Sequence, residues 1–290
     1  MFRPFAAFLL ALLSACSPLK GFNAIVPKDG GVELVARDAA YGPLPRQSLD
    51  VYAPRADAAG PRPVIVFIYG GSWRSGTKDG YGFAARALAT GGFVVAVPDY
   101  RLVPEARYPA FVEDGAAAVR WVRANAARLG ADPDRIVLVG HSAGAYNAAM
   151  LSLDPRFLGA DRAAVRGFVG LAGPYDFLPL DGPITRAAFG QATDLPATQP
   201  VNAASAGDPP VLLLHGDLDD TVYPRNSQAL ARKLGAAGVR ATVTLYPYLG
   251  HVGILTALSK PYRVRAPVLA DTLRFAREVT VAVPAAAASR

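Results

Sequence analysis

Five continuous apolar runs constrain the fold of this chain more than any other feature of its sequence. Each run is short, rich in valine, leucine or isoleucine, and bounded by proline, glycine or charged residues. Such runs are typical of strands that are buried on both faces of a parallel sheet. The runs lie at residues 63–69, 93–98, 135–140, 165–173 and 210–216.

Segments between these runs have the pattern of helices. Residues 110–129, for example, repeat their apolar side chains at a spacing of about 3.6 residues. Strands that alternate with helices predict an α/β fold with a mostly parallel, doubly wound sheet flanked by helices. Residues 32–36 and 48–52 predict leading antiparallel strands, and residues 241–246 predict a last strand.

Three segments depart from this alternation. Residues 178–208 are rich in Pro, Gly, Ala and Asp and lie where one crossover helix would be enough, so they predict a small cap insertion. Residues 17–31 predict a spacer, which makes residues 17–44 a linker with a leading strand. Residues 279–290 show no polar–apolar period and predict a disordered tail.

Residues 1–16 have the pattern of an export signal. An early arginine precedes an apolar run at residues 5–13, which is shorter than the ~20 residues that a membrane-spanning helix needs. Residues 13–16 (LSAC) resemble the bacterial lipoprotein signal, whose cysteine becomes the lipidated first residue of the mature chain. This resemblance predicts lipidation at Cys16 and an exported protein of the bacterial cell envelope, membrane-anchored and facing the periplasm. The alternative is an ordinary cleaved signal with an incidental cysteine.

The composition is that of one globular domain. The chain has 290 residues, of which 52% are hydrophobic and 18% are charged, so it can bury a large core. The formal net charge is +7, but the basic residues are scattered and are not interleaved with aromatic residues. We interpret this charge as a solvated surface and expect no nucleic-acid partner. The oligomeric state stays open.

The strongest local motif is GHSAG at residues 140–144. A buried strand leads directly into it and an Ala-rich helix follows, which is the context of a nucleophile elbow. The flanking glycines allow a sharp turn that lifts the hydroxyl of Ser142 above the sheet. The amide of Ala143 is then a candidate donor to an oxyanion.

A serine nucleophile needs a base and a group that orients the base. Only three histidines are available: His141 lies inside the elbow, His215 ends a buried strand, and His251 follows the last predicted strand. Chain order in this fold class is serine, acid, histidine, which selects His251. The acid is expected just after the strand at residues 210–216, where the candidates are Asp217, Asp219 and Asp220.

A glycine pair follows the first buried strand, in YGGSW at residues 69–73. The main chain of Gly70 and Gly71 can approach a substrate closely, so their amides are further candidate donors to an oxyanion. The alternative is that these glycines merely form a turn.

Several motifs together resemble the esterase and lipase branch of the α/β-hydrolase superfamily, near its hormone-sensitive-lipase-like and feruloyl or acetylxylan esterase-like members. The motifs are GHSAG, YGGSW and PDYRLVPEARYPAFVED, and the resemblance covers residues 45–278 as the catalytic domain. The family pattern His-Gly-x-x-Asp-x-x-Val aligns with residues 215–222 and selects Asp219 as the acid. The resemblance also implies that Asp99 and Arg101 are scaffold residues near the oxyanion loop and not catalysts, and we interpret them as a structural ion pair. Tyr69 departs from the family, whose members usually have histidine there.

The resemblance implies a serine carboxylesterase, and the short cap predicts small acyl groups. Candidate substrate-pocket residues are Tyr69, Trp73, Tyr175 and Phe177, although aromatic residues after strands more often belong to the core. One alternative function is aryl-formamide hydrolysis, as in kynurenine formamidase-like proteins. Another is a non-catalytic binding protein on a hydrolase scaffold. No metal or organic cofactor is expected, because there is no His- or Cys-rich ligand set and no phosphate loop.

Overall fold

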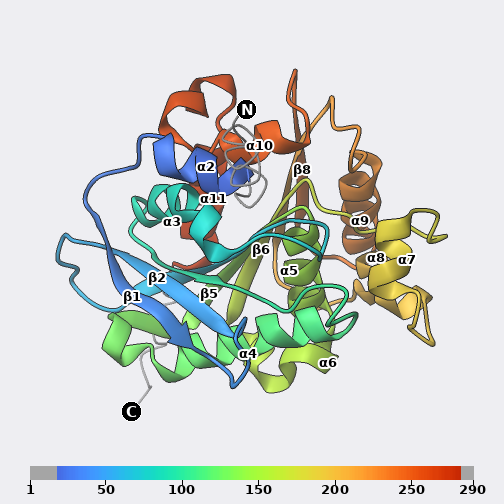
Figure 1. Ribbon diagram of the computed structural model, residues 1–290, viewed down its shortest axis with the longest axis horizontal. Coiled ribbons are helices and arrows are strands. Elements are labelled where there is room, and N and C mark those ends of the chain that lie inside the picture. The colour runs from blue at the N-terminus through green and yellow to red at the C-terminus, as the bar shows by residue number, and fades with distance from the viewer. Residues whose placement is uncertain (1–17, 282–290) are drawn as a thin grey trace, which may run out of the picture.

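A computed structural model describes residues 18–281, which fold around one eight-stranded sheet (Figure 1). The strand order is β1-β2-β4-β3-β5-β6-β7-β8. β2 pairs antiparallel with β1 and with β4, and all other pairs are parallel. The strands are β1 (Val32–Ala40), β2 (Ser48–Pro54), β3 (Arg62–Ile68), β4 (Val94–Pro98), β5 (Ala131–His141), β6 (Val165–Leu171), β7 (Val211–Gly216) and β8 (Ala241–Tyr246).

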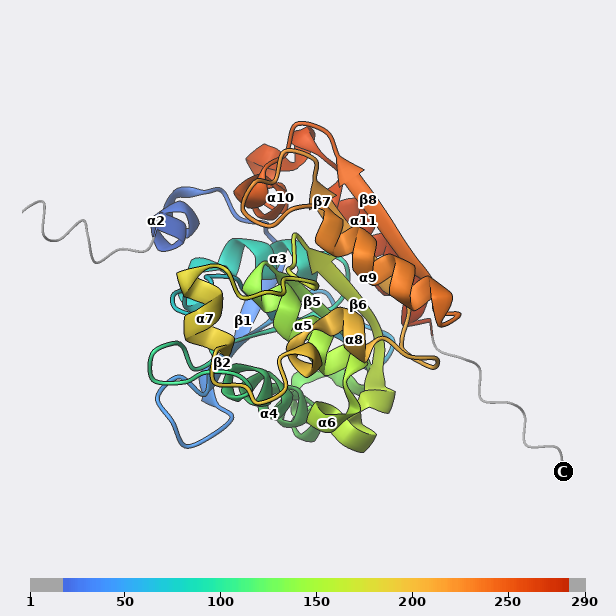
Figure 2. The ribbon, with the colours of Figure 1, turned by 90° about the vertical axis from the view of Figure 1, so that its right-hand side faces the viewer.

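Helices cover both faces of the sheet (Figures 1 and 2). On one face α3 and α11 pack against each other, and on the other α4 packs against α5 while α8 bridges α5 and α9. The predicted α/β fold is therefore confirmed. The helices are α2 (Pro18–Ile25), α3 (Gly82–Ala89), α4 (Ala110–Ala124), α5 (Ala143–Leu153), α6 (Pro155–Leu158), α7 (Pro183–Phe189), α8 (Pro200–Ala203), α9 (Arg225–Ala236), α10 (His251–Thr256) and α11 (Val268–Val279).

The apolar runs become the central strands because both faces of each strand are covered. Every residue of β4 and β7 is buried, as is β3 from Val64 to Ile68. Helix α5, which lies directly on these strands, is buried along its whole length. Its alanines are small enough to let its main chain approach the sheet closely. Burial of this apolar area is the main stabilising contribution to the fold.

The N-terminal part of the chain differs from its prediction. Residues 18–25, expected as spacer, form helix α2, and β1 extends to Ala40. Tertiary contacts explain this helix, because Phe22 packs edge-on against Phe83 of α3 at a ring distance of 5.1 Å. Asn23 accepts a hydrogen bond from the N–H of Phe83 through Oδ1, at 2.9 Å. The predicted signal segment and Cys16 lie outside the described residues.

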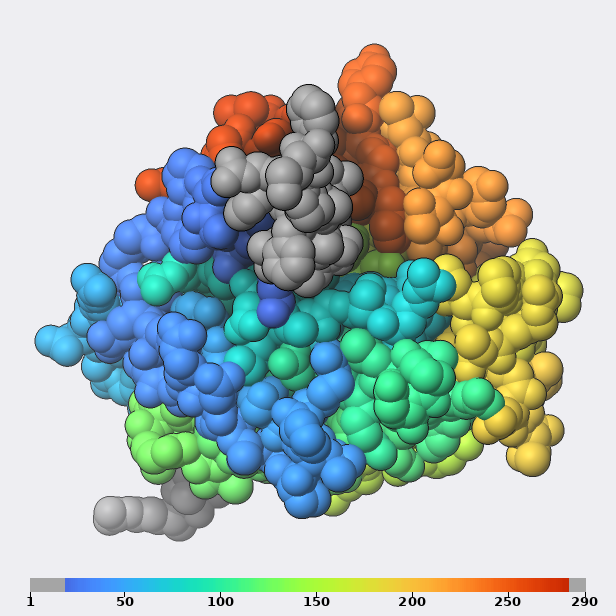
Figure 3. All heavy atoms as spheres, in the orientation of Figure 1, coloured from blue at the N-terminus to red at the C-terminus, as the bar shows by residue number. Residues whose placement is uncertain are grey.

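The segment expected as a cap connects β6 to β7 and contains α7 and α8 with a short 3-10 turn between them. It lies beside the loop that follows β4, where the N–H of Tyr108 donates to the carbonyl of Ala188 at 2.9 Å. Figure 3 shows this segment in yellow at the right of the molecule, next to the cyan and green residues.

The end of the chain also departs in part from its prediction. Helix α11 includes Val279, and the Thr280 N–H bonds back to this helix, so the start of the expected tail is ordered. Residues 282–290 lie outside the description. Within residues 18–281, none of the helices combines the length and the apolar character needed to span a bilayer.

Candidate active site

Ser142 stands at the junction between β5 and α5 with φ 54° and ψ −124°. A positive φ is costly for a residue with a side chain, and such strain is typical of a nucleophile elbow. The two flanking glycines make the turn possible. A Cβ added to Gly140 would lie 2.3 Å from the carbonyl oxygen of Gly144. A Cβ added to Gly144 would lie 2.0 Å from the carbonyl oxygen of Ile68.

His251 lies at the start of α10, after β8, and faces Ser142. Its Nδ1–H donates to Oδ2 of Asp219 at 2.8 Å, because a carboxylate can only accept. This fixes the tautomer, and Nε2 accepts from the Ser142 hydroxyl at 2.9 Å. The structure thus brings together the three residues that the sequence predicts, from three separate segments of the chain.

Asp219 is buried, 3% exposed, and its carboxylate is fully engaged. Oδ1 accepts from the N–H groups of Thr221 and Val222 at 3.0 and 2.8 Å. Oδ2 also lies 3.2 Å from Nε2 of His215. Burial alone would raise the pKa of Asp219, but the hydrogen bonds from His215, His251 and Val222 lower it well below its usual range. Asp219 is therefore ionised at neutral pH.

The two neighbouring aspartates lie away from His251. Asp217 accepts from the N–H of Tyr248 at 2.8 Å, and Asp220 is exposed and accepts from the Thr221 hydroxyl at 3.5 Å. Both make the loop contacts that are usual for aspartate in turns. Geometry and sequence motif thus select the same carboxylate.

His141, inside the elbow, is buried beside His251. Burial, and then the charge of His251, lower the pKa of His141 to about 3. Its imidazole is therefore neutral at physiological pH. Its ring centroid lies 5.0 Å from that of His251.

The loop after β3 places Gly70 next to Ser142, and Gly71 follows it in the same loop. A Cβ on Gly70 would lie 2.8 Å from the Cβ of Ser142, so only glycine allows this approach. Gly71 has φ 136°, which also favours glycine. In the described part of the chain, neither the Gly70 nor the Gly71 N–H donates to a protein acceptor. The N–H of Ala143, in the first turn of α5, has no acceptor within its own helix either.

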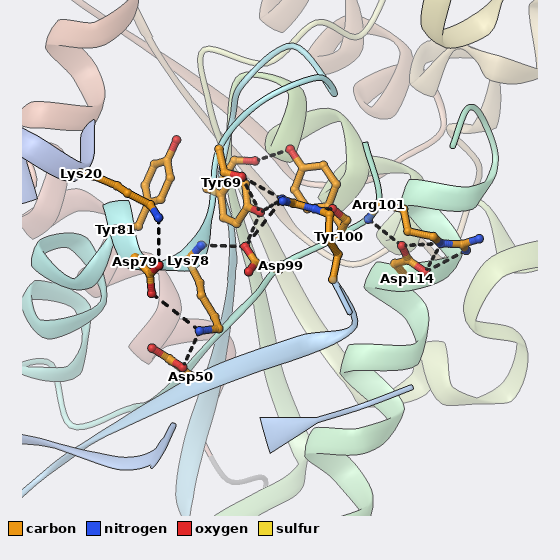
Figure 4. Close-up of polar contacts among 12 residues, drawn as sticks. Lys20, Asp50, Tyr69, Lys78, Asp79, Tyr81, Asp99, Tyr100, Arg101 and Asp114 are labelled. Atoms are coloured by element: carbon orange, nitrogen blue, oxygen red, sulfur yellow. Dashed lines mark hydrogen bonds and ion pairs between the residues drawn. The ribbon is translucent and has the colours of Figure 1, made fainter. Parts of the chain in front are cut away.

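Tyr69 lies beneath this loop and does not face the substrate side. It is fully buried, and its hydroxyl donates to Oδ1 of Asp99 at 2.5 Å (Figure 4). The expected ion pair between Asp99 and Arg101 is absent from the described residues. Arg101 instead pairs with Asp114 of α4 at 2.8 Å, because the side chains of Asp99 and Arg101 point to opposite sides of the loop.

A cavity of about 410 Å³ opens at Ser142. Trp73 and Phe177 line it, as predicted, together with Ile184 from the inserted segment. The pocket prediction is wrong for Tyr69 and Tyr175: both are fully buried and belong to the core. Trp73 is held in place by its indole N–H, which donates to Oδ1 of Asn147 at 3.1 Å.

Three residues support the site in ways that the sequence did not predict. His215 touches Asp219, and its position in the His-Gly-x-x-Asp pattern could have indicated this contact. Oδ1 of Asn226 accepts from the N–H groups of Tyr175 and Asp176, both at 2.9 Å, and so orders the loop that carries Phe177. Arg46 lies under the loop that follows β3, where it donates to the Tyr69 hydroxyl and to the carbonyl of Gly76, and no local sequence motif indicates this role.

Among residues 18–281, no cluster of three or more His, Cys, Asp or Glu side chains is arranged to hold a metal ion. The side chains gathered at Ser142 supply a hydroxyl, an imidazole base and a buried carboxylate, and the main chain supplies free amide donors. This set can form and stabilise a tetrahedral adduct at a carbonyl carbon.

Comparison with known proteins finds this chain similar to proteins named as esterases. Residues 49–234 match the BD-FAE family model. Over 254 residues the chain is 30% identical to the probable isoprenylcysteine alpha-carbonyl methylesterase ICMEL1 of Oryza sativa subsp. japonica, covering 79% of this chain and 59% of that protein. The chain therefore spans about three fifths of the length of that curated relative.

Two solved structures share the fold. Apo Thermogutta terrifontis esterase 2 is 26% identical, with a TM-score of 0.69 and coverage of 87% of this chain and 94% of that chain. Esterase B of Lactobacillus rhamnosis is 21% identical, with a TM-score of 0.79 and coverage of 95% and 94%. The second likeness concerns the fold alone.

Proposed function

Because the chain belongs to the BD-FAE family and has the α/β-hydrolase fold, we propose that it is a serine carboxylesterase that cleaves short-chain esters through an acyl-enzyme on Ser142. One observation carries this proposal. The hydrogen bonds from Ser142 to His251 and from His251 to Asp219 measure 2.9 and 2.8 Å, so nucleophile, base and orienting acid are already aligned.

In the first half of the reaction, Nε2 of His251 takes the Ser142 proton as Oγ attacks the ester carbonyl. Asp219 holds the imidazole in the accepting tautomer and stabilises the imidazolium as it forms. The free N–H groups of Gly70, Gly71 and Ala143 donate to the oxyanion of the tetrahedral adduct. The adduct collapses as His251 returns the proton to the leaving alcohol, which leaves an acyl group on Ser142.

In the second half, a water molecule gives a proton to His251 and attacks the acyl carbon. A second tetrahedral adduct forms on the same donors and releases the carboxylic acid. Ser142 regains its proton from His251. No step requires a metal ion or an organic cofactor, and we expect full activity in the presence of a chelator.

The size of the cavity supports small substrates. Its volume of about 410 Å³ lies near the low end of the ~300–1,000 Å³ that ligand pockets usually enclose. Trp73 and Phe177 form one wall, with ring centroids 6.3 Å apart, and Ile184 of the inserted segment lines the same cavity. We expect acetate and butyrate esters to be hydrolysed faster than palmitate esters.

The site of action that we propose is the bacterial cell envelope. The LSAC sequence at residues 13–16 supports lipidation at Cys16, which would tether the catalytic domain to a membrane facing the periplasm. Mass spectrometry of the membrane fraction would detect the acylated N-terminus. A Cys16→Ala variant that remains in that fraction would contradict the anchor.

The test of the activity is hydrolysis of p-nitrophenyl acetate, butyrate and palmitate, with the Ser142→Ala variant as control. We expect turnover of the two short esters that is lost in the variant. An N-formyl arylamine is assayed in parallel. Turnover of the formamide without turnover of the esters would move the assignment to an aryl-formamide hydrolase, and failure on all substrates would favour a binding protein.

A further inference from the structure

Three tyrosine rings form a stack beneath the oxyanion loop. Tyr69 lies between Tyr81 and Tyr100, at centroid distances of 4.8 and 4.9 Å and interplanar angles of 14° and 27°. All three rings are fully buried, and they come from three separate segments of the chain. Figure 4 shows them beside one another, with Asp99 below Tyr69.

The hydroxyls of the two outer rings reach the main chain of the loop. The Tyr100 hydroxyl donates to the carbonyl of Tyr69 at 2.9 Å. The Tyr81 hydroxyl donates to the carbonyl of Gly70 at 3.2 Å. These carbonyls belong to the two peptide groups that contain the N–H groups of Gly70 and Gly71.

A trans peptide group is planar, and its N–H points away from its C=O. A donor that fixes the direction of the Tyr69 carbonyl therefore also fixes the direction of the Gly70 N–H. The same argument links the Gly70 carbonyl to the Gly71 N–H. Each phenol hydroxyl thus controls one of the two amides that face no acceptor within residues 18–281.

We propose that Tyr81 and Tyr100 are positioning residues that orient the oxyanion-binding amides of Gly71 and Gly70, one hydroxyl for each peptide group. This inference rests on the proposed esterase function. The hydrogen bond at each carbonyl also polarises its peptide group, which strengthens the N–H as a donor. Orientation and polarisation both act on the oxyanion, which exists only in the tetrahedral states, so they lower the barrier without affecting ester binding.

The central ring, that of Tyr69, is fixed by hydrogen bonds of its own hydroxyl. The Tyr69 hydroxyl donates to Asp99 and accepts from Nη2 of Arg46 at 2.9 Å. Nη2 of Arg46 also donates to the carbonyl of Gly76 at 2.8 Å, at the far end of the same loop. Burial raises the pKa of Tyr69, Tyr81 and Tyr100 well above the ordinary value, so all three hydroxyls remain protonated donors at neutral pH.

The test uses Tyr100→Phe and Tyr81→Phe, which keep the ring stack and remove only the hydroxyl. The matched control is Tyr246→Phe, because the Tyr246 hydroxyl is a donor to Asp271, at 2.6 Å, away from the loop. We expect kcat on p-nitrophenyl butyrate to fall about 10-fold in each loop variant with KM unchanged, less than the 10²–10³ that loss of a whole donor costs. Tyr100→Phe should have the larger effect, because its hydrogen bond is shorter.

Affinity for a trifluoromethyl ketone provides a second readout, since this inhibitor forms a tetrahedral oxyanion adduct on serine. Its affinity should fall by the same factor as kcat, while the thermal unfolding midpoint shifts no more than in Tyr246→Phe. Unchanged kcat and inhibitor affinity in an active protein would overturn the inference, as would a rise in KM alone. An inactive wild-type protein would instead reject the proposed function.

Discussion

Nε2 of His141 donates a hydrogen bond of 3.1 Å to the main-chain carbonyl of His251, so the elbow that carries the nucleophile also holds the loop that carries the base. Nδ1 of His141 is buried and has no partner among the described residues. Protonation would place an uncompensated charge there, next to the imidazole that must accept a proton. Burial of Nδ1, rather than the contact itself, therefore favours a neutral His141.

Stability should depend on pH through this residue. The pKa of His141 is about 3 in the folded protein and about 6.5 in the unfolded chain. A lowered histidine pKa favours the folded state fully above pH 6.5, and this contribution is lost as pH falls towards 3. His141→Gln keeps a donor to His251 but does not titrate. Urea unfolding at pH 7 and pH 4 should show that the wild type loses up to about 3 kcal/mol more than the variant; equal losses would contradict the prediction.

Asp219 should be essential, whereas its neighbour Asp220 should not. Asp219→Asn replaces an acceptor by an amide that can donate to Nδ1 of His251, which stabilises the wrong imidazole tautomer. We expect kcat to fall by about 10³-fold or more. Asp220→Asn has the same chemistry on an exposed side chain and should keep its activity. Steady-state kinetics of the two variants checks this prediction. Equal losses of kcat would show that the substitutions disturb the loop and do not act through the imidazole tautomer.

Two glycine-to-alanine changes should have opposite effects on stability. At Gly144 the new Cβ would lie 2.0 Å from the carbonyl oxygen of Ile68, so main chain must move. We expect a loss of about 3 kcal/mol or more in the free energy of unfolding. At Gly235, in α9, nothing lies within 4 Å, and alanine should stabilise by about 0.5–1 kcal/mol through the unfolded chain. Denaturant titration of both variants measures these changes. A Gly144→Ala variant as stable as the wild type would show that the main chain of the elbow can relax.

Phe177 should limit the length of the acyl group. Its half-buried ring lies 5.2 Å from that of Phe189 and faces the cavity at Ser142. Phe177→Ala enlarges this space, and we expect the ratio of octanoate to acetate turnover to rise about 10-fold, as expected for a few added methylene contacts. Phe157→Ala, on α6, serves as the control. An unchanged ratio would mean that the acyl chain binds elsewhere.

Much of the fold could be predicted because the central strands are buried on both faces and their sequences are continuously apolar. The Ser142 elbow is contiguous in sequence, and His251 was selected because only three histidines exist. Asp219 could not be separated from its neighbours by residue type alone. The family motif was needed, and only the folded loop explains the choice, through the amides of Thr221 and Val222.

Other features depended on contacts between distant segments. Arg46 donates to the carbonyl of Tyr100 at 2.7 Å across many residues, and no local pattern encodes such a contact. Asp99 and Arg101 are close in sequence and opposite in charge, which favoured an ion pair, but Arg101 turns to Asp114. Helix α2 is short and contains Gly21, so its propensity is weak and packing against α3 determines it.

The docking of α2 has a practical consequence for preparing this protein. Nδ2 of Asn23 donates to the carbonyl of Asp79 at 2.7 Å, and the N–H of Lys78 in the same turn donates to Asp99 at 2.7 Å. Asp99 is also the acceptor of the Tyr69 hydroxyl. A recombinant version that omits residues 1–17 should therefore start no later than Pro18, because we expect a later start to weaken the contacts that hold Asp99 under Tyr69.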